Sequence, residues 1–181
     1  MSRRRRAAAL VLAALWLSGC ATRPPVPDDE GSVGGRLSLK VERPGEPPRN
    51  LAARFDLEGT AREGRLVLDT PIGTRVAQAR WSPDGAWLDS ERGAERFADL
   101  DALAIGALGE PVPLAALPDW LRGRPWTGAP VEPGATPELF VQRHQQQDWQ
   151  VSLQERAAGW VLITKLPIPS AVSLRVRLDK P

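Results

Sequence analysis

Apolar residues recur at every second position in six successive stretches of the first half of the chain. This period of two is typical of half-buried strands, and Pro, Gly and Asp residues mark turns between the stretches. Short turns between consecutive strands favour an antiparallel meander with one apolar face and one wet face. The predicted strands cover residues 37–42, 51–58, 65–69, 75–81, 86–90 and 94–97.

The period changes to that of a helix after these strands. Asp99 is a typical N-cap, Gly109 is a typical helix end before a proline, and the apolar residues between them share one helical face. A second, short helical piece is predicted at residues 113–117. The apolar face of the first helix comprises Leu100, Leu103, Ala104, Ala107 and Leu108.

Strands resume after a Pro- and Gly-rich loop at residues 128–137. Four further stretches are predicted to be strands, at 138–143, 149–154, 160–165 and 172–178. About ten strands with one helical insertion predict a mainly β fold, in which a strongly curved antiparallel sheet carries helices on its concave side. A sheet that wraps around helices without closing leaves an apolar hollow.

An apolar residue occupies an unusual place in the turn between the third and fourth predicted strands. Thr70-Pro71-Ile72-Gly73 has the composition of a type I turn, and Ile72 stands at its third position. A β-branched apolar side chain contributes nothing to such a turn and would face water. Either the tip folds under a neighbouring loop and buries Ile72, or Ile72 is exposed for a purpose.

Two tryptophans lie close to arginines around a Pro-Gly turn at residues 118–126. This composition predicts aromatic packing with guanidinium stacking at one end of the sheet. Trp120 and Trp126 fit two roles, as plugs of the core or as stacking surfaces for a ligand. The sequence leaves both roles open.

Residues 1–19 have the pattern of a secretion signal, with four arginines at 3–6 and 11 apolar residues at 7–17, too few to span a bilayer. Leu17-Ser18-Gly19-Cys20 is typical of the lipobox of bacterial lipoproteins, in which the cysteine is lipidated; the alternative is an ordinary signal with an incidental Cys20. Residues 20–34 are then a lipidated N-terminus and flexible tether, and residues 35–181 are one globular domain.

Removing this leader changes the charge of the chain. The sequence has 24 basic and 22 acidic residues, and four of the basic ones are in the leader, so 20 remain against 22, a formal net charge of about −2. The remaining arginines alternate with acidic residues, which predicts no basic patch and no nucleic-acid partner. With Cys20 lipidated, no thiol remains for a disulfide, a metal site or catalysis.

Catalytic machinery is not apparent in the sequence. The one histidine, His144, is predicted to lie in a polar Gln-rich loop, where neither a Ser-His-Asp triad nor a His-based metal site can be assembled. The sequence contains neither a Walker loop nor a dinucleotide-binding glycine pattern. We therefore expect neither an enzyme nor a cofactor or metal.

Several motifs, taken in their order and spacing, resemble the LolB family of outer-membrane lipoprotein receptors. The similarity covers most of residues 35–178 and is strongest from 66 to 126. The motifs that carry it are Leu17-Ser18-Gly19-Cys20, Gly35-Arg36-Leu37-Ser38, Ala53-Arg54-Phe55, Thr70-Pro71-Ile72-Gly73, Gly109-Glu110-Pro111-Val112-Pro113 and Asp119-Trp120-Leu121-Arg122-Gly123-Arg124-Pro125.

The resemblance implies an incomplete, unclosed antiparallel β-barrel of about ten to eleven strands, with helices across its open side and an apolar cavity for lipoprotein acyl chains. It implies that a LolA-like periplasmic carrier hands over lipoproteins, which are then inserted among the phospholipids of the outer membrane. It implies a monomer that is lipid-anchored at the periplasmic face of that membrane. Pro71, Ile72 and Gly73 match the family's protruding membrane-insertion loop. Strand alternation then suggests as cavity wall and lid Leu37, Leu39, Leu66, Leu68, Leu100, Leu103 and Leu108.

Two other classes of function fit the sequence. A β-rich lipoprotein subunit of an envelope assembly complex would show a large exposed apolar patch on the convex face and no hollow of acyl-chain size. A lipoprotein enzyme would show a cleft with converging polar groups of perturbed pKa. The concave side of the sheet distinguishes these classes.

Overall fold

The computed structural model describes residues 31–167 and 172–180, so the predicted leader, Cys20 and most of the predicted tether lie outside the described residues. The described part contains eleven strands. Their bounds are β1 Val33–Val41, β2 Arg49–Gly59, β3 Gly64–Asp69, β4 Arg75–Ser82, β5 Gly85–Ser90, β6 Gly93–Phe97, β7 Val131–Pro133, β8 Leu139–His144, β9 Gln147–Ser152, β10 Trp160–Lys165 and β11 Val172–Leu178.

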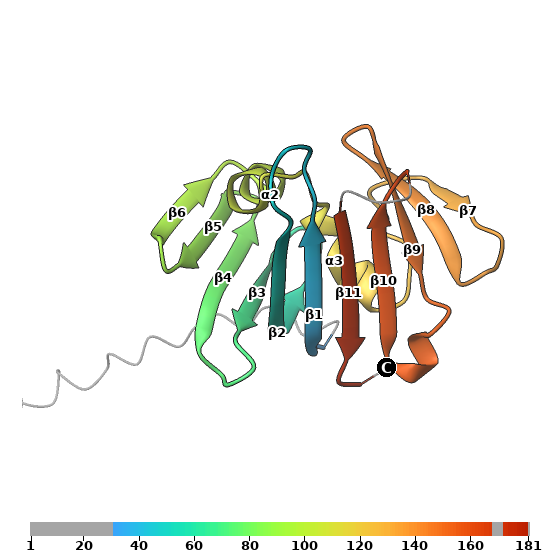
Figure 1. The fold of residues 1–181 in the computed structure, drawn as a ribbon, viewed down its shortest axis with the longest axis horizontal. Helices are drawn as coiled ribbons and strands as arrows, with labels where there is room; N and C mark the ends of the chain where they lie inside the picture. The colour runs from blue at the N-terminus through green and yellow to red at the C-terminus, as the bar shows by residue number, and fades with distance from the viewer. Residues whose placement is uncertain (1–30, 168–171, 181) are drawn as a thin grey trace, which may run out of the picture.

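All these strands belong to one antiparallel sheet with the order β6-β5-β4-β3-β2-β1-β11-β10-β9-β8-β7 (Figure 1). The chain builds one half as a meander from β1 to β6, crosses over through the helices, and builds the other half from β7 to β11. The pairing of β1 with β11 joins the two halves. Because β6 and β7 remain edges, the sheet does not close, and the predicted mainly β, incomplete antiparallel barrel is confirmed.

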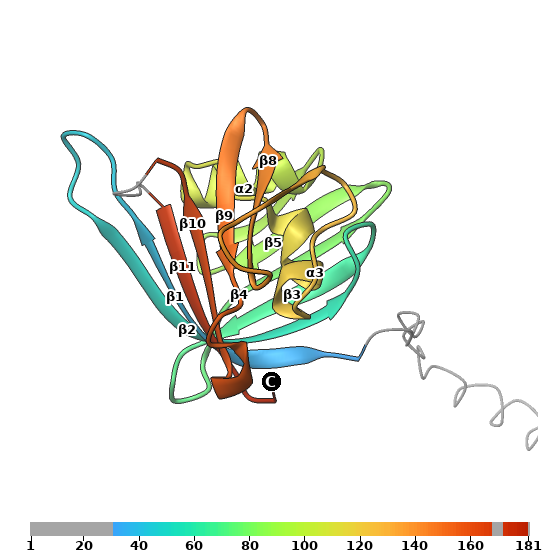
Figure 2. The ribbon, with the colours of Figure 1, turned by 90° about the vertical axis from the view of Figure 1, so that its right-hand side faces the viewer.

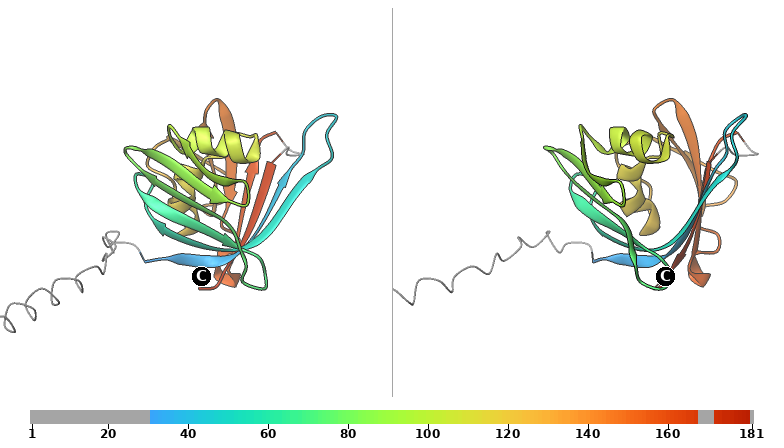
Figure 3. Two further views of the ribbon diagram at one scale, coloured as in Figure 1. Left: turned by 90° about the vertical axis from the view of Figure 1, so that its left-hand side faces the viewer. Right: turned by 60° about the vertical axis from the view of Figure 1, so that its left-hand side comes forward.

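Two helices lie on the concave side of the sheet, as predicted (Figures 2 and 3). Helix α2, Leu100–Leu108, begins after Asp99, whose carboxylate accepts a hydrogen bond from the Ala102 backbone N–H at 2.7 Å. Gly109 ends it with φ 71°, the left-handed conformation that glycine adopts without strain. The 3₁₀ helix η2, Leu114–Ala116, leads directly into α3, Leu117–Leu121. The helix thus extends into residues predicted to form a turn, because Pro118 fits its first turn.

Several strand predictions need correction. Strand β1 begins at Val33, four residues before its predicted start and inside the predicted tether, and β2 begins two residues before its predicted start. Strand β7 lies inside the stretch predicted to be a loop, since its three exposed residues show no alternation. Strand β9 begins two residues before the predicted start. Gln145 and Gln146 both have positive φ, 47° and 64°, so β8 and β9 are joined by a two-residue turn. Glutamine is not typical of such a turn, and the sequence therefore gave no sign of it.

The apolar face of the sheet and the helices together form the core. Trp120 of α3 is 1% exposed, so its role as a core plug is the correct alternative. Arg124 pairs with Asp119 at 2.8 Å, and guanidinium stacking on Trp120 and Trp126 stays a prediction. Within the described residues, no helix is long and apolar enough to cross a membrane.

A buried glutamine fastens α3 to the second half of the sheet. Gln142 of β8 is 1% exposed. Its side-chain oxygen accepts hydrogen bonds from Trp120 Nε1 at 2.7 Å and from the Trp126 N–H at 2.9 Å. Its amide nitrogen donates to the carbonyls of Trp126 and Ala129 at 2.7 and 2.8 Å. All the hydrogen-bonding capacity of the Gln142 amide is used, as a buried polar group requires.

Gln142→Leu should lower the free energy of unfolding by about 3 kcal/mol, because it leaves the Trp120 and Trp126 N–H groups without their buried acceptor. Urea unfolding measures this loss. Gln150→Leu is the matched control, since Gln150 lies on the neighbouring strand and is only half-buried; it should change stability by less than about 0.5 kcal/mol. Equal effects of the two substitutions would contradict this account of the network.

Candidate functional site

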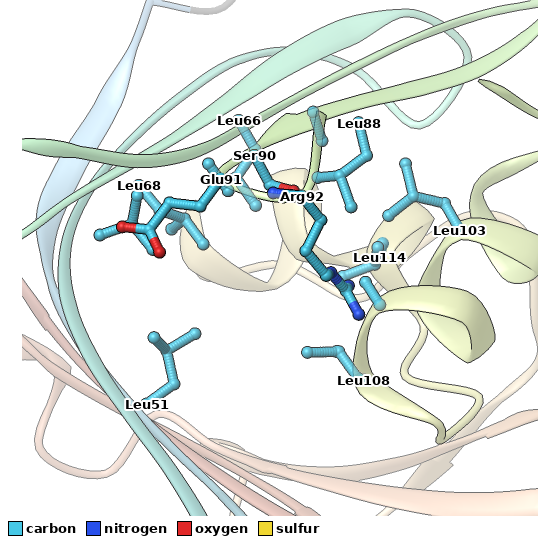
Figure 4. A pocket seen from close by; sticks show the side chains of 14 residues that line it. Leu51, Leu66, Leu68, Leu88, Ser90, Glu91, Arg92, Leu103, Leu108 and Leu114 are labelled. Atoms are coloured by element: carbon cyan, nitrogen blue, oxygen red, sulfur yellow. The ribbon is translucent and has the colours of Figure 1, made fainter. Parts of the chain in front are cut away.

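An apolar hollow of about 430 Å³ lies between α2 and the first half of the sheet. Strands β2 to β5 form one wall, and α2 and η2 form the other (Figure 4). Leu51, Leu66, Leu68 and Leu88 line it from the strands, and Leu103, Leu108 and Leu114 line it from the helices. The remaining apolar lining consists of Val76, Ala77, Ala79 and Ala107.

Polar side chains reach the hollow from one place, the turn between β5 and β6. Ser90, Glu91 and Arg92 are its polar lining residues. Figure 4 shows the Glu91 side chain extending toward Leu68 of β3 and the Arg92 side chain extending toward Leu108 of α2. Both residues are exposed. An apolar interior with a charged rim suits a ligand that has a long apolar part and a polar end.

The structure brings together four of the seven predicted cavity residues, Leu66, Leu68, Leu103 and Leu108. The other three, Leu37, Leu39 and Leu100, pack into or against the core instead. Leu37 and Leu39 lie on β1, beyond the strands β2 to β5 that form the wall. Alternation predicts which face a residue occupies, but only the curvature of the sheet decides which part of that face stays open.

Register identifies lining residues that the sequence prediction missed. Leu66 of β3 is paired with Ala79 of β4, which is paired in turn with Leu88 of β5. Residues paired across neighbouring strands lie on the same face, so a correct pairing of these hairpins would have added Ala79 and Leu88 to Leu66. Leu51 and Leu114 come from the far end of β2 and from η2, and no short-range pattern links them to the others.

Polar contacts hold α2 over the hollow near both ends. Near its start, the Asp101 carboxylate lies 2.9 Å from Nε2 of His144 on β8. At its end, Arg43 Nη2 donates to the Leu108 carbonyl at 2.8 Å. Glu110 follows the helix and pairs with both Arg43, at 3.4 Å, and Lys165 of β10, at 3.0 Å. Helix α2, which covers the hollow as a lid, is therefore attached to both halves of the sheet.

His144 is not the exposed loop residue that the sequence predicted. It ends strand β8, its side chain is 10% exposed, and its ring packs edge-on against Trp126 with centroids 5.9 Å apart. Its Gln-rich surroundings are the turn that follows it. Within the described residues, no group of three or more His, Cys, Asp or Glu side chains is placed to hold a metal ion.

Ile72 lies at the tip of the hairpin formed by β3 and β4 and is 90% exposed. The Gly73 N–H donates to the Thr70 carbonyl at 2.9 Å, and Gly73 has φ 91°. A turn closed in this way and followed by a left-handed glycine is a common three-residue hairpin loop. The alternative that Ile72 is a core residue is wrong.

The exposed tip continues directly from the wall of the hollow. Leu68 precedes the turn by two residues and Val76 follows it by two, and both line the hollow. The hairpin projects beyond the edge of the sheet (Figure 1). One hairpin therefore links the apolar interior to an apolar residue in solvent.

Comparisons with known proteins agree in one assignment. The family model described as outer membrane lipoprotein LolB matches residues 31–179. An outer-membrane lipoprotein LolB of Cupriavidus taiwanensis is 32% identical and aligns with 99% of this chain and 90% of its own length. Proteins of the same name from Bordetella petrii and Cupriavidus pinatubonensis are 30% and 35% identical, over 91% and 83% of this chain and 87% and 77% of their own lengths.

Ala77→Phe should weaken binding of a fluorescent long-chain fatty acid at least tenfold. Ala77 lines the hollow, and an aromatic ring needs roughly 150 Å³, about a third of the space. Ala52→Phe is the matched control, because Ala52 is exposed on the outer face of β2 and should leave probe binding unchanged. Probe titration of both folded variants checks this; unchanged affinity of the Ala77 variant would place the probe elsewhere.

Proposed function

This chain belongs to the LolB family of outer-membrane lipoproteins, and from that premise we propose that it accepts lipoproteins from a LolA-like periplasmic carrier and inserts them into the outer membrane. Family membership supports a role in lipoprotein localisation at the outer membrane. The family is one of non-catalytic lipoprotein receptors, so the protein is not an enzyme. The carrier, the acyl-chain site and the insertion step are the parts that we add.

The observation that carries this proposal is the hollow between α2 and β2 to β5. Each acyl methylene removed from water contributes about 0.8 kcal/mol, so a lipoprotein's chains need an apolar container on their way to the membrane. A cavity of roughly 150 Å³ holds one six-carbon ring. At the same volume per carbon, the hollow of about 430 Å³ has room for roughly one long acyl chain. A lipoprotein with several acyl chains can then be bound in two ways. Either α2 moves outward and enlarges the hollow, or the additional acyl chains stay at the charged rim.

Transfer in this scheme runs down a gradient of apolar affinity. The sequence contains no Walker loop that would couple nucleotide hydrolysis to release. The hollow must therefore bind acyl chains better than the carrier does and worse than a bilayer does. An open, partly lined hollow meets this requirement better than a closed cavity, because one side of the bound chain keeps access to solvent or membrane.

The tip of the hairpin supplies the contact with the bilayer. Ile72 exposes 90% of its surface, which gives it nearly its full apolar area to bury in lipid. That burial contributes about 1.5–3 kcal/mol, enough to bias a reversible contact and too little to hold the protein on a membrane. Pro71 and Gly73 shape the turn that presents it. The β3–β4 hairpin thus places the end of the cavity wall next to the inner leaflet of the outer membrane.

Anchoring is assigned to Cys20, lipidated after removal of residues 1–19. The predicted tether of residues 20–34 leads into β1, which begins at Val33, so its last two residues belong to the sheet. Ten residues lie between Cys20 and residue 31, and the eleven residue-to-residue steps span at most about 40 Å when fully extended. The body, residues 35–181, can therefore reach a carrier in the periplasm while it stays at the periplasmic face of the outer membrane.

A subunit of an envelope assembly complex is the less favoured alternative. Such a protein should present a large apolar patch on its convex face. The large exposed apolar residues of the described part are instead scattered over different elements: Ile72, Ile105, Val131 and Leu162. This distribution, together with the hollow, supports the receptor.

A form of the protein that starts after Cys20 should still take lipoprotein from the carrier in solution, because the hollow is built entirely from the described residues 51–114. Co-purification of labelled lipoprotein with this form measures uptake, and circular dichroism reports its fold. A folded form that takes up no lipoprotein would contradict a self-contained acyl-chain site.

Ile72→Glu should fold normally and accept lipoprotein but deliver it slowly, since the turn loses little and the tip loses its affinity for lipid. The experiment loads the variant with labelled lipoprotein, adds liposomes and follows bound and inserted label separately. Val131→Glu is the control, because Val131 is a 46% exposed apolar residue on edge strand β7 and should insert cargo like the wild type. Insertion by the Ile72 variant at the wild-type rate would overturn the role of the tip.

A further inference from the structure

Four arginines gather on the convex face of the sheet, which is turned toward the viewer in Figure 1. Arg36 of β1 is paired in register with Arg177 of β11 on one side and with Arg54 of β2 on the other. Arg175 lies on the same face of β11, two residues before Arg177, and all four are exposed. We call Arg36, Arg54, Arg175 and Arg177 the convex arginine cluster. The prediction of no basic patch is therefore wrong, because register gathers arginines that acidic residues separate along the chain.

The cluster makes few ion pairs of its own, since Asp69, which lies opposite Arg54, pairs instead with Arg75 at 2.6 Å. Within the described residues, its one ion pair joins Arg54 to Asp179 at 3.9 Å, with the two side chains 47% and 59% exposed. An exposed pair at that distance contributes little to stability. Like charges directly opposite each other destabilise a sheet. Arg36 lies directly opposite both Arg177 and Arg54, so these charges repel one another, and an anion from outside would relieve the repulsion.

An aromatic ring lies under two of these guanidinium groups. Trp160 of β10 has the Arg175 guanidinium 4.2 Å and the Arg177 guanidinium 5.4 Å from its ring centroid. Leu162 is the next residue on this face of β10, is paired with Arg175 and is 42% exposed. Tryptophan, arginine and an exposed leucine together are typical of protein surfaces at a lipid–water interface.

The cluster adjoins the hairpin tip. Arg54 is paired with Asp69, the residue that precedes the turn at 70–74. The tip, the start of β1 and the end of β11 lie at the same lower edge in Figure 1. The described chain also enters β1 three residues before Arg36. The exposed Ile72, the proposed tether and the cluster are therefore neighbours.

We infer that the convex arginine cluster is a docking surface for the anionic phospholipid headgroups of the membrane in which the protein is anchored. The planar guanidinium fork donates two parallel hydrogen bonds to a phosphate, and the repulsion within the cluster falls when phosphates lie between its members. Docking on this face sets the tip against the leaflet. The inference rests on the proposed function for the lipid anchor and the role of Ile72.

The test uses the full lipidated protein in vesicles. Ala52 is exposed on β2, two residues before Arg54, and Ala52→Cys places a fluorophore beside the cluster. A quencher on the lipid headgroups reports how close this face lies to the bilayer. Quenching should rise when phosphatidylglycerol is added to phosphatidylcholine, and it should fall in roughly 1 M salt, where charge attraction is screened within about 3 Å.

The double substitution Arg36→Gln and Arg177→Gln should lower the ratio of docked to undocked protein about 25-fold, roughly fivefold for each cation removed. The corresponding double lysine variant keeps the charges and should keep most of the quenching, which separates lost charge from misfolding. Arg80→Gln is the matched control. Arg80 is an exposed arginine of β4 that is in register, across β3, with Glu58 of β2. Glu58 lies four positions from Arg54, roughly 13 Å along the strand, so removal of Arg80 should leave quenching unchanged.

Three results would overturn the docking surface: equal quenching in neutral and anionic vesicles, wild-type quenching by the double glutamine variant, or an equal loss on removal of Arg80. A double glutamine variant that docks normally but no longer takes lipoprotein from the carrier would assign the cluster to the carrier instead. Fatty-acid binding is measured on the same samples. If the wild-type protein binds the fatty acid but does not dock on anionic vesicles, this inference alone is overturned. If the wild-type protein does not bind the fatty acid, the proposed function is overturned.

Discussion

The hollow depends on polar contacts that hold α2 at a fixed height above the sheet. Apolar cavities cost stability, and side chains normally move inward to fill them. Here Asp101 is bonded to His144 on β8, and the last carbonyl of α2 accepts from Arg43, whose partner Glu110 also binds Lys165 on β10. His144 and Lys165 lie on strands of the second half of the sheet and Arg43 lies in the loop between β1 and β2, so the helix cannot move toward the sheet without breaking polar contacts with both halves. Helix α2 also packs apolar side chains, Leu100, Leu103 and Ala104, into the core, and the polar contacts fix how far its other end lies from the sheet.

The sheet presents three different surfaces. Its concave face is apolar and lies under the helices, where the core and the hollow meet. Its hairpin tip presents one isoleucine to solvent. Its convex face carries the arginine cluster, with Trp160 beneath two of the guanidinium groups. Because β3 and β4 contribute both to the wall of the hollow and to the tip, one hairpin joins the apolar interior to the exposed isoleucine.

Local patterns predicted the elements well and their assembly only in part. Period-two alternation located ten of the eleven strands, and Asp99 and Gly109 marked the ends of α2 because capping is a local interaction. Strand β7 escaped because it is short and exposed. His144 appeared to be a loop residue because Gln145 and Gln146 form their turn without glycine or asparagine. The partner of His144, Asp101, is 43 residues away, beyond any sequence pattern.

The residues that line the hollow could be predicted only in part from the sequence, for a physical reason. Alternation placed Leu39 and Leu66 on the same face, yet Leu39 is core and Leu66 lines the hollow. The difference comes from the curvature of the sheet and the position of α2, which depend on contacts between distant segments. The convex arginine cluster was hidden for the same reason. Charge alternates along each strand, and only the register of β2, β1 and β11 brings the arginines together.

The central claim, that a lipoprotein acyl chain lies in the hollow, is tested most directly by photo-crosslinking. A lipoprotein with a photoreactive group within its acyl chain is loaded from the carrier, irradiated and mapped by peptide mass spectrometry. The account predicts adducts on peptides of β3 to β5 and α2, at residues such as Leu66, Leu88 and Leu103. Adducts on the convex face of strands β10 and β11, with none in the lining of the hollow, would contradict this claim.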